Sequence, residues 1–431
     1  MKAWFHTLGC KVNQYETQAM RRLLEDEGYE TAEFAPGQPD VGEAMLVINS
    51  CTVTGESDRK LRQLLRRCRR EHPQAVLVLT GCFPQAFPDG AEALPEPDVI
   101  LGNAARRELP ERLAQYLTEK RRVVAIAPHS REYESLSICE FQGRTRAFVK
   151  IEDGCDRFCS YCIIPHARGR VRSKPLDELK TEVEALARRG YREIVLVGIN
   201  LTAYGKDTGA SICDAVEVAA APKGICRVRL GSIEPDHLTD EVLARLAACD
   251  KLCPQFHLAL QSGCDATLRR MNRHYTAAEY RELCSKLRTA FPGCALTTDV
   301  MVGFPGETAE EFDESLKFVG EIGFSRVHCF PYSRREGTPA AKASDQVPNA
   351  EKLRRNRLLI AAAERSRVAF ESALVGQTVE VLPETERADG RLEGYTDTYV
   401  PVLVDGGTVG VPCTVRITGY ENGMCFGYAE A

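Results

Sequence analysis

The chain has 431 residues, which is more than one ordinary core holds, so its length predicts two or three domains. Hydrophobic residues make up 44% and charged residues 27%, a balance that excludes a disordered or membrane-embedded chain. The formal net charge of −5 excludes a protein that binds polyanions through its overall charge.

The first residues, MKAWFHTLGCKVNQYE, contain no long apolar run and no small-residue cleavage site, so we expect no signal peptide. No stretch reaches the length of a membrane span, and the predicted location is the cytoplasm. Disulfides need an oxidising compartment, so the 18 cysteines indicate metal ligands, catalytic thiols or small buried side chains.

Residues 1–128 alternate short apolar strands with amphipathic helices, which predicts a small α/β layer with a parallel sheet. A weakly patterned connector follows, from 128 to 144. The expected strands of this layer are 2–9, 44–50, 75–81 and 97–103.

From 146 to about 340 the chain repeats a strand and a helix about six times, which favours a (β/α) barrel. Eight repeats would make a complete barrel, so six predict an open one. A basic helical connector is expected near 349–374. The tail from 376 shows short strands with turn signals, which predicts a small all-β barrel or sandwich.

Charge is distributed unevenly along the chain. Residues 59–70 carry seven positive charges and no acid, and residues 351–370 carry six basic residues against two acids. The last 61 residues hold three Arg, no Lys and ten acids. This opposition predicts a nucleic-acid surface in one part of the molecule.

Three cysteines, Cys155, Cys159 and Cys162, follow the first strand of the expected barrel with the spacing C-x3-C-x2-C. A structural zinc site needs four ligands, usually in two pairs, and no fourth Cys or His has a paired spacing. An iron–sulfur cube held by three cysteines leaves one iron open, which is typical of a catalytic site. Loops after barrel strands form the active-site face, so the position agrees. Structural zinc or scattered buried cysteines are the less favoured alternatives.

With the aromatic Tyr161 before its last cysteine, this motif resembles that of the radical S-adenosylmethionine enzymes. The resemblance implies that Cys155, Cys159 and Cys162 hold a 4Fe–4S cluster whose fourth iron is chelated by S-adenosylmethionine. Reductive cleavage of this cofactor then gives a 5′-deoxyadenosyl radical.

The same resemblance implies cofactor contacts at successive strand ends. The edge from Gly198 to Asn200 is expected at the methionine amino group, and Glu234 at the ribose hydroxyls. Taken singly, each glycine also fits a plain turn. The implied cofactor-binding residues are Tyr161, Gly198, Asn200, Ser232, Glu234, Gln261, Asp299 and Gly303.

A second set of cysteines, Cys10, Cys51 and Cys82, lies upstream, each just past an expected strand. The carboxyl ends of strands in an open α/β sheet meet at one crevice, so these thiols can converge. From the chain alone, metal binding and scattered buried cysteines remain open alternatives of equal weight.

Over essentially its whole length, the chain resembles the methylthiotransferases. The resemblance implies an α/β protein with three parts: an N-terminal methylthiotransferase domain at 1–128, a partial (β/α)6 radical barrel with a basic linker helix at 140–370, and a TRAM-like β-barrel at 371–431. It also implies a second 4Fe–4S cluster on Cys10, Cys51 and Cys82, where sulfur is handled.

The opening TLGCKVNQYET is most similar to the branch that acts on threonylcarbamoyladenosine in tRNA. The branches acting on isopentenyladenosine or on ribosomal protein S12 carry other residues after the first cysteine and remain alternatives. The implied reaction inserts sulfur at carbon 2 of the adenine 3′ to the anticodon and methylates it. A radical is needed there because an unactivated aromatic C–H offers no acid–base handle.

The resemblance implies three partners: the tRNA anticodon stem-loop, an electron donor such as flavodoxin or ferredoxin, and a sulfur donor that the sequence does not identify. Phosphate neutralisation supplies much of RNA affinity, so we do not expect the acidic tail to bind RNA by charge. The predicted RNA contacts are Arg62, Arg66, Arg69, Arg168, Arg170 and Arg172, although each also fits a solvated surface. A non-catalytic iron–sulfur protein is the rival class, but it would need no cofactor motifs at its strand ends.

Overall fold

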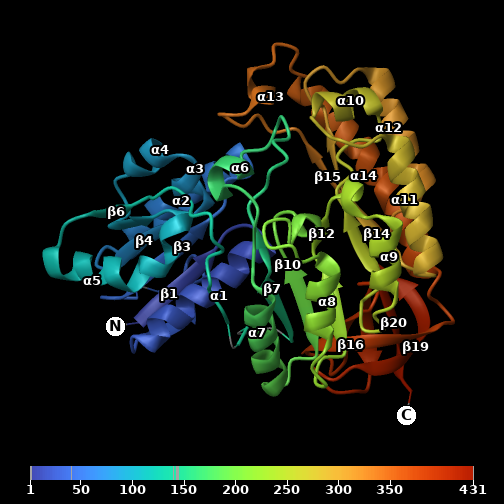
Figure 1. Cartoon of the computed structure of the whole chain (residues 1–431), viewed down its shortest axis with the longest axis horizontal. Helices are drawn as coiled ribbons and strands as arrows, with labels where there is room; N and C mark the ends of the chain where they lie inside the picture. The colour runs from blue at the N-terminus through green and yellow to red at the C-terminus, as the bar shows by residue number, and fades with distance from the viewer. Residues whose placement is uncertain (1, 40, 139, 142–144, 431) are drawn as a thin grey trace.

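The computed structural model describes residues 2–39, 41–138, 140–141 and 145–430. Figure 1 shows an N-terminal α/β layer (blue to cyan) beside a larger body of strands and helices (green to orange), with a small β-barrel (red) beneath that body. Among the described residues, no helix combines the length and the apolar composition needed to cross a membrane.

The N-terminal layer is a six-stranded parallel sheet in the order β2-β1-β3-β4-β5-β6. Its strands are β1 (Lys2–Thr7), β2 (Glu30–Glu33), β3 (Met45–Ser50), β4 (Val76–Gly81), β5 (Val99–Leu101) and β6 (Val123–Ala125). Its helices are α1 (Lys11–Asp26), α2 (Gly55–Glu71), α3 (Cys82–Ala86), α4 (Pro88–Glu92), η1 (Asn103–Glu108) and α5 (Leu109–Glu119).

Both faces of this sheet are covered, which explains why β3 and β4 are continuous apolar runs rather than alternating ones. Leu46 and Ile48 of β3 pack in the cluster that contains Leu61 and Leu65 of α2. Val47 faces the opposite cluster with the buried side chains of α1 and α5. The two helix layers therefore hold the strand ends, and the loops that follow them, in a fixed plane.

The central body is an open barrel of six parallel strand positions, as predicted. The third position breaks at Gly231, so that β11 pairs with β10 while β12 pairs with β13. The strands of this open barrel are β7 (Arg146–Lys150), β10 (Glu193–Val197), β11 (Arg227–Leu230), β12 (Ser232–Ile233), β13 (Gln255–Leu258), β14 (Ala295–Val302) and β15 (Arg326–Pro331). In the described chain, β7 and β15 have no strand on their outer edges, and α1 packs against β7.

Helices cover the outside of this barrel, and three of them begin with capping boxes, at Ser211, Thr276 and Thr308. The covering helices are α7 (Leu176–Arg188), α8 (Ile212–Ala220), α9 (Asp240–Ala247), α10 (Asp265–Arg270), α11 (Ala277–Ala290) and α12 (Ala309–Ile322). Shorter elements are β8 (Glu152–Asp153), β9 (Arg172–Ser173), α6 (Ile164–Arg168), η2 (Leu201–Ala203), η3 (Pro235–His237) and α13 (Pro339–Lys342).

Helix α14 (Asn349–Ser372) leads into the tail, which forms a closed barrel around buried side chains such as Val381 and Val402. Two acidic residues of this tail form ion pairs with arginines of the central body. Glu384 pairs with Arg146 and Glu380 with Arg227, at the starts of β7 and β11. The barrel strands of the tail are β16 (Thr378–Glu386), β17 (Leu392–Thr396), β18 (Pro401–Asp405), β19 (Cys413–Glu421) and β20 (Met424–Ala429).

Candidate functional site

The first cysteine trio lies in the loop between β8 and α6, and that loop is fixed to its surroundings. The amide of Cys155 donates to the carbonyl of Gly169 at 3.0 Å, and the hydroxyl of Ser160 donates to the carbonyl of Arg270 at 2.7 Å. Burial raises the pKa of Cys155 to about 12, and burial with the neighbouring Cys159 does the same for Cys162. Such thiols stay protonated unless a metal binds them.

Glu152, which precedes this loop, is a buried carboxylate that the sequence did not single out. One of its oxygens accepts hydrogen bonds from the amides of Ile199 and Asn200, each at 2.7 Å. A Cβ at Gly198 would lie 2.6 Å from the same oxygen. The other oxygen, Oε1, is buried and has no hydrogen-bond partner among the described residues, and burial raises the pKa of Glu152 to about 8. Its only sequence signal is an acid at a strand end beside the cysteines.

Glu234 reaches the cysteine loop through Arg273. The guanidinium of Arg273 donates to both carboxylate oxygens of Glu234 and lies 3.3 Å from the Sγ atom of Cys159. Arg273 is therefore a buried cation beside a candidate metal ligand. It was not predicted, because nothing in its local sequence shows that the segment after α10 brings it to Cys159.

Of the five remaining predicted cofactor residues, two line a cavity and three make contacts with neighbouring protein segments. Ser232 and Asp299 line the large cavity described below. Gln261 adopts a left-handed conformation (φ 67°) and exchanges backbone hydrogen bonds with β14, so its position serves the sheet. Gly303 packs against Lys352 of α14, and Tyr161 makes an edge contact with Phe304 at 6.2 Å between ring centroids.

The structure brings the second trio, Cys10, Cys51 and Cys82, to one edge of the N-terminal sheet, after β1, β3 and β4. A Cβ at Gly9 would lie 3.2 Å from the Sγ atom of Cys51, which leaves no room for a side chain there. Burial raises the pKa of Cys82 to about 11, and the charge of Arg168 opposes this shift. Cys10 is exposed, whereas its two companions are buried.

A buried network of charges lies between the two trios. The guanidinium of Arg168 donates to Glu16 at 2.8 Å and to Asp153 at 2.9 Å. Lys150 joins the same two carboxylates at 3.0 and 3.2 Å, and Arg106 pairs with Glu16 at 2.9 Å. Together these groups connect α1, β7 and β8, which flank the two sites.

This network corrects two of the predicted RNA contacts. Arg168 is 1% exposed and Arg172 is 5% exposed, because both bind Asp153 or its neighbours rather than solvent. Neither can reach a phosphate, so these predictions are wrong. The side chain of Arg170 is 84% exposed and keeps its place as a candidate.

Helix α2 presents only part of its predicted basic face. Arg62 is exposed and lies over the ring of Phe83, the residue after Cys82, at 5.8 Å. Arg66 is also exposed and lies 3.7 Å from Glu96. Arg69 is a weaker candidate, because its guanidinium already binds the carboxylate of Asp98 at 2.6 Å and three backbone carbonyls nearby.

A cavity of about 690 Å³ is lined by all three parts of the chain. Cys10 and Lys11 contribute from the N-terminal layer, and Tyr399 contributes from the tail barrel. Inward-facing side chains of the central strands complete the wall, namely Val197, Gly198, Leu230, Gly231, Ser232, Gln255, His257, Thr297, Asp299, Arg326 and His328.

His257, Asp299 and His328 form a cluster in this cavity that sequence reasoning missed. The Nε2 atom of His257 lies 3.3 Å from a carboxylate oxygen of Asp299, and one ligand atom from each residue lies within 4.8 Å of the others. Burial alone would raise the pKa of Asp299, but the hydrogen bond and charge of His257 lower it. The alternation of β13 and β15 was the available signal, since it turns both imidazoles inward.

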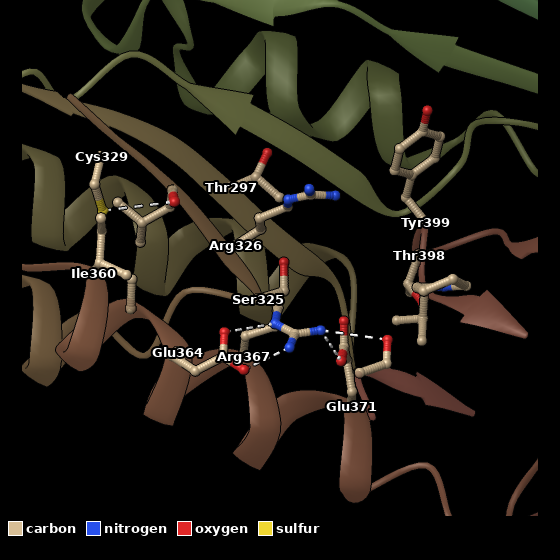
Figure 2. A pocket seen from close by; sticks show the side chains of 15 residues that line it. Thr297, Ser325, Arg326, Cys329, Ile360, Glu364, Arg367, Glu371, Thr398 and Tyr399 are labelled. Atoms are coloured by element: carbon tan, nitrogen blue, oxygen red, sulfur yellow. Dashed lines mark hydrogen bonds and ion pairs between the residues drawn. The ribbon is translucent and has the colours of Figure 1, made fainter. Parts of the chain in front are cut away.

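A second cavity, of about 380 Å³, adjoins the first at Thr297, Arg326 and Tyr399. Figure 2 shows Arg326 extending toward the side on which Tyr399 lies, whereas Arg367 is held by Glu364 and Glu371. In the second cavity, the charge of Arg367 is therefore neutralised by acids of its own helix, whereas Arg326 is shared by both cavities.

Two family models match the chain: the Radical SAM superfamily over residues 149–319, and the Uncharacterized protein family UPF0004 over residues 2–102. The threonylcarbamoyladenosine tRNA methylthiotransferase MtaB of Bacillus subtilis is 40% identical over 93% of this chain and 90% of its own. That of Thermotoga maritima is 39% identical over 95% and 93%. A tRNA-2-methylthio-N(6)-dimethylallyladenosine synthase of Clostridium novyi is 34% identical over 96% and 93%.

Among solved structures, the radical S-adenosylmethionine methyltransferase TsrM from Kitasatospora setae is similar with a TM-score of 0.56. It is 16% identical and covers 79% of this chain and 77% of its own. The cobalamin-dependent radical enzyme OxsB has a TM-score of 0.53 at 14% identity, covering 84% and 56%. At these identities the likeness concerns the fold.

Proposed function

This chain belongs to the radical S-adenosylmethionine methylthiotransferase family, and we propose that it adds a methylthio group to carbon 2 of N6-threonylcarbamoyladenosine, 3′ to the anticodon of tRNA. One observation carries the proposal. Cys10 of the second trio lines the same cavity as Gly198, which packs against Glu152 beside the first trio. A substrate base in that cavity would lie beside Cys10 and beside Gly198, the residue that packs against Glu152.

Membership of the family implies a 4Fe–4S cluster and S-adenosylmethionine, which together supply a 5′-deoxyadenosyl radical when bound. Cys155, Cys159 and Cys162 would hold the cluster, because a loop with three thiols and no fourth cysteine leaves one position open. Arg273 places a positive charge 3.3 Å from the Sγ atom of Cys159. The unpartnered Oε1 of Glu152 fits a donor such as the methionine ammonium, beside the edge from Gly198 to Asn200.

Cys10, Cys51 and Cys82 would hold a second 4Fe–4S cluster, at which sulfur is handled. Three thiol donors at one edge of the sheet suit iron–sulfur ligation, because iron–sulfur clusters are held by cysteine thiolates. The charge of Arg168 lowers the pKa of Cys82 against the effect of burial, so it favours the thiolate that metal binding needs. The amide of Asn103 lies 3.6 Å from the Sγ atom of Cys82 and can donate to it.

The closed tail barrel is the TRAM-like part of the family architecture, and it contributes Tyr399 to the cavity. We assign 1–128, 140–370 and 371–431 as the three domains, since each range contains one of the sheet systems. A loop base of the tRNA anticodon stem-loop can be splayed out and stacked, which suits entry into such a cavity. An electron donor of the flavodoxin or ferredoxin class would supply the reducing electron.

The test is anaerobic reconstitution followed by assay on anticodon stem-loops. Wild type should convert the threonylcarbamoyl substrate, with little product from an isopentenyladenosine stem-loop or from ribosomal protein S12. Cys155→Ala should form no 5′-deoxyadenosine. Replacing Cys10, Cys51 and Cys82 with Ala together should keep reductive cleavage but stop formation of the methylthio product.

Cys249→Ala is the matched control, because Cys249 lies behind the barrel, just after α9, away from both trios. It should retain full iron content and full activity. Continued cleavage of S-adenosylmethionine by Cys155→Ala would refute the assignment of the first site. Full product from the triple variant would refute the second.

A further inference from the structure

Lys11 follows Cys10 directly and begins α1, yet its side chain extends into the barrel rather than to solvent. Its Nζ atom lies 5.8 Å from the ring centroid of Phe148 on β7 and 5.8 Å from that of Tyr399. Lys11 lines the large cavity. Within the described residues, Nζ has aromatic faces around it and no ion-pair or hydrogen-bond partner. A secluded ammonium without an acceptor is costly, so the position favours an anionic ligand.

The rest of the cavity floor does not supply that anion. The buried carboxylate of Glu193 is already bound by Arg229 at 2.9 Å and lies near Arg227 and Arg146 at 3.7 and 4.0 Å. Asp299 is paired with His257. Glu193 is neutralised by these arginines, and Asp299 lies against His257 rather than against Lys11, so neither acid pairs with Lys11.

A second cation faces the same space. Arg326, at the start of β15, lines both cavities, and within the described part of the chain it forms no ion pair. Figure 2 shows its guanidinium on the side of Tyr399. Burial alone would raise the pKa of Tyr399, but Arg146, Lys11 and Arg229 lower it. A phenol shifted in this direction reports a positive potential at the floor.

We propose that Lys11, with Arg326, binds the carboxylate of the threonyl group that the substrate adenosine carries on N6. The inference rests on the proposed function, and it explains how the chain selects this substrate. The N6 substituent is attached at carbon 6 of the purine ring, and the C–H bond at carbon 2 points in a different direction. A base with carbon 2 toward Cys10 can therefore place its N6 group elsewhere in the cavity. An isopentenyl group would leave the secluded ammonium of Lys11 unpaired and would give Arg326 no anion to bind, which disfavours that substrate.

The test uses the reconstituted enzyme and three stem-loops that differ only at N6: the threonylcarbamoyl form, its carboxyl methyl ester and the isopentenyl form. Dissociation constants come from fluorescence anisotropy, and product comes from single-turnover assays. A charged hydrogen bond at a secluded site corresponds to an affinity ratio of roughly 10 to 100 between acid and ester. Lys11→Met should lose this preference by weakening only the binding of the acid.

Lys180→Met is the matched control, because Lys180 is exposed on α7, and it should keep the wild-type ratio. Arg326→Met is the second variant, at an exposed position, and should lower the ratio in the same direction even if Lys11→Met folds poorly. A wild type that binds and converts acid and ester equally would overturn the inference while the proposed function stands. An unchanged ratio in both variants would also overturn it. A wild type inactive on the threonylcarbamoyl stem-loop would overturn the proposed function, and the inference with it.

Discussion

The guanidinium of Arg168 donates to the carboxylate of Glu16 at 2.8 Å, and each residue lies six positions past a cysteine, Cys162 and Cys10 respectively. The contact joins α6, the helix after the first trio, to α1, the helix after Cys10 of the second trio. Both side chains are buried, and the network that surrounds them also takes in Asp153. The relative position of the two candidate centres is therefore set by ion pairs as well as by apolar packing.

Arg168→Met should destabilise the protein by about 3–5 kcal/mol, because it leaves Glu16 and Asp153 with less compensating charge in a buried site. Urea denaturation followed by circular dichroism measures the change in the free energy of unfolding. Arg170→Met is the control, since its exposed side chain predicts a change within about 0.5 kcal/mol. Equal stability of the two variants would show that the network contributes no more than a surface charge.

Because the pKa of Glu152 is raised, we expect protein without added S-adenosylmethionine to lose stability as pH rises. Burial raises the pKa of Glu152 to about 8 in the folded state, above the unfolded value of about 4.3. The folded state therefore binds the extra proton, and stability falls between about pH 5 and pH 8. Glu152→Gln should remove this dependence, so that at pH 8 it gains roughly 2–4 kcal/mol relative to wild type.

Denaturation of both proteins at pH 5.5 and pH 8 checks this prediction. Glu92→Gln, at an exposed position on α4, should follow the wild-type curve. If wild type and Glu152→Gln lose stability in parallel over this range, the carboxyl of Glu152 is not the group that titrates.

Gly9→Ala should damage the second site while sparing the first. A Cβ there would lie 2.8 Å from the Cβ of Cys51, and the backbone has φ +114°. Reconstituted protein should lose about half of its iron, since one of two clusters is affected. It should still form 5′-deoxyadenosine. Gly28→Ala is the control, because Gly28 has φ +84° but nothing within 4 Å of an added Cβ. Full iron in Gly9→Ala would argue against Cys51 as a ligand.

Arg62 and Arg66 should contribute to tRNA binding through phosphate contacts. Each such contact contributes about 0.7–0.9 to the log–log dependence of affinity on salt. Changing both residues to Gln should therefore flatten the slope by roughly 1–2. Filter binding between low and moderate salt measures this. Lys180 and Lys317, exposed on the outer helices α7 and α12, changed together to Gln, form the control pair. An unchanged slope in the Arg62 and Arg66 variant would move the RNA-binding face elsewhere.

Short sequence patterns were enough to predict those parts of the protein whose geometry follows from motif spacing and strand order. The loop from Cys155 to Cys162 could be recognised because three ligands in one loop are close whatever the fold around them. The convergence of Cys10, Cys51 and Cys82 was foreseeable because parallel strands end at one edge of a sheet. The six-stranded open barrel followed from the number of strand–helix repeats, and the tail barrel from its turn signals.

The sequence alone determined the main strands, their order and the two cysteine sets, because these depend on periodicity and spacing within short segments. It missed the short edge strands β2 and β6, which have too few buried residues to show a pattern. Only the tertiary structure decided which charged side chains are available. The sequence predicted Arg168 and Arg172 to be surface cations, yet both are buried, where Arg168 binds Glu16 and Arg172 lies near Asp153. Arg62, by contrast, is exposed. Lys11 and Tyr399 meet, although 388 positions separate 11 from 399, because the tail barrel docks beneath the central strands through Glu384 and Glu380. Burial and ion pairing are properties of packed surfaces, and no local pattern encodes which surfaces meet.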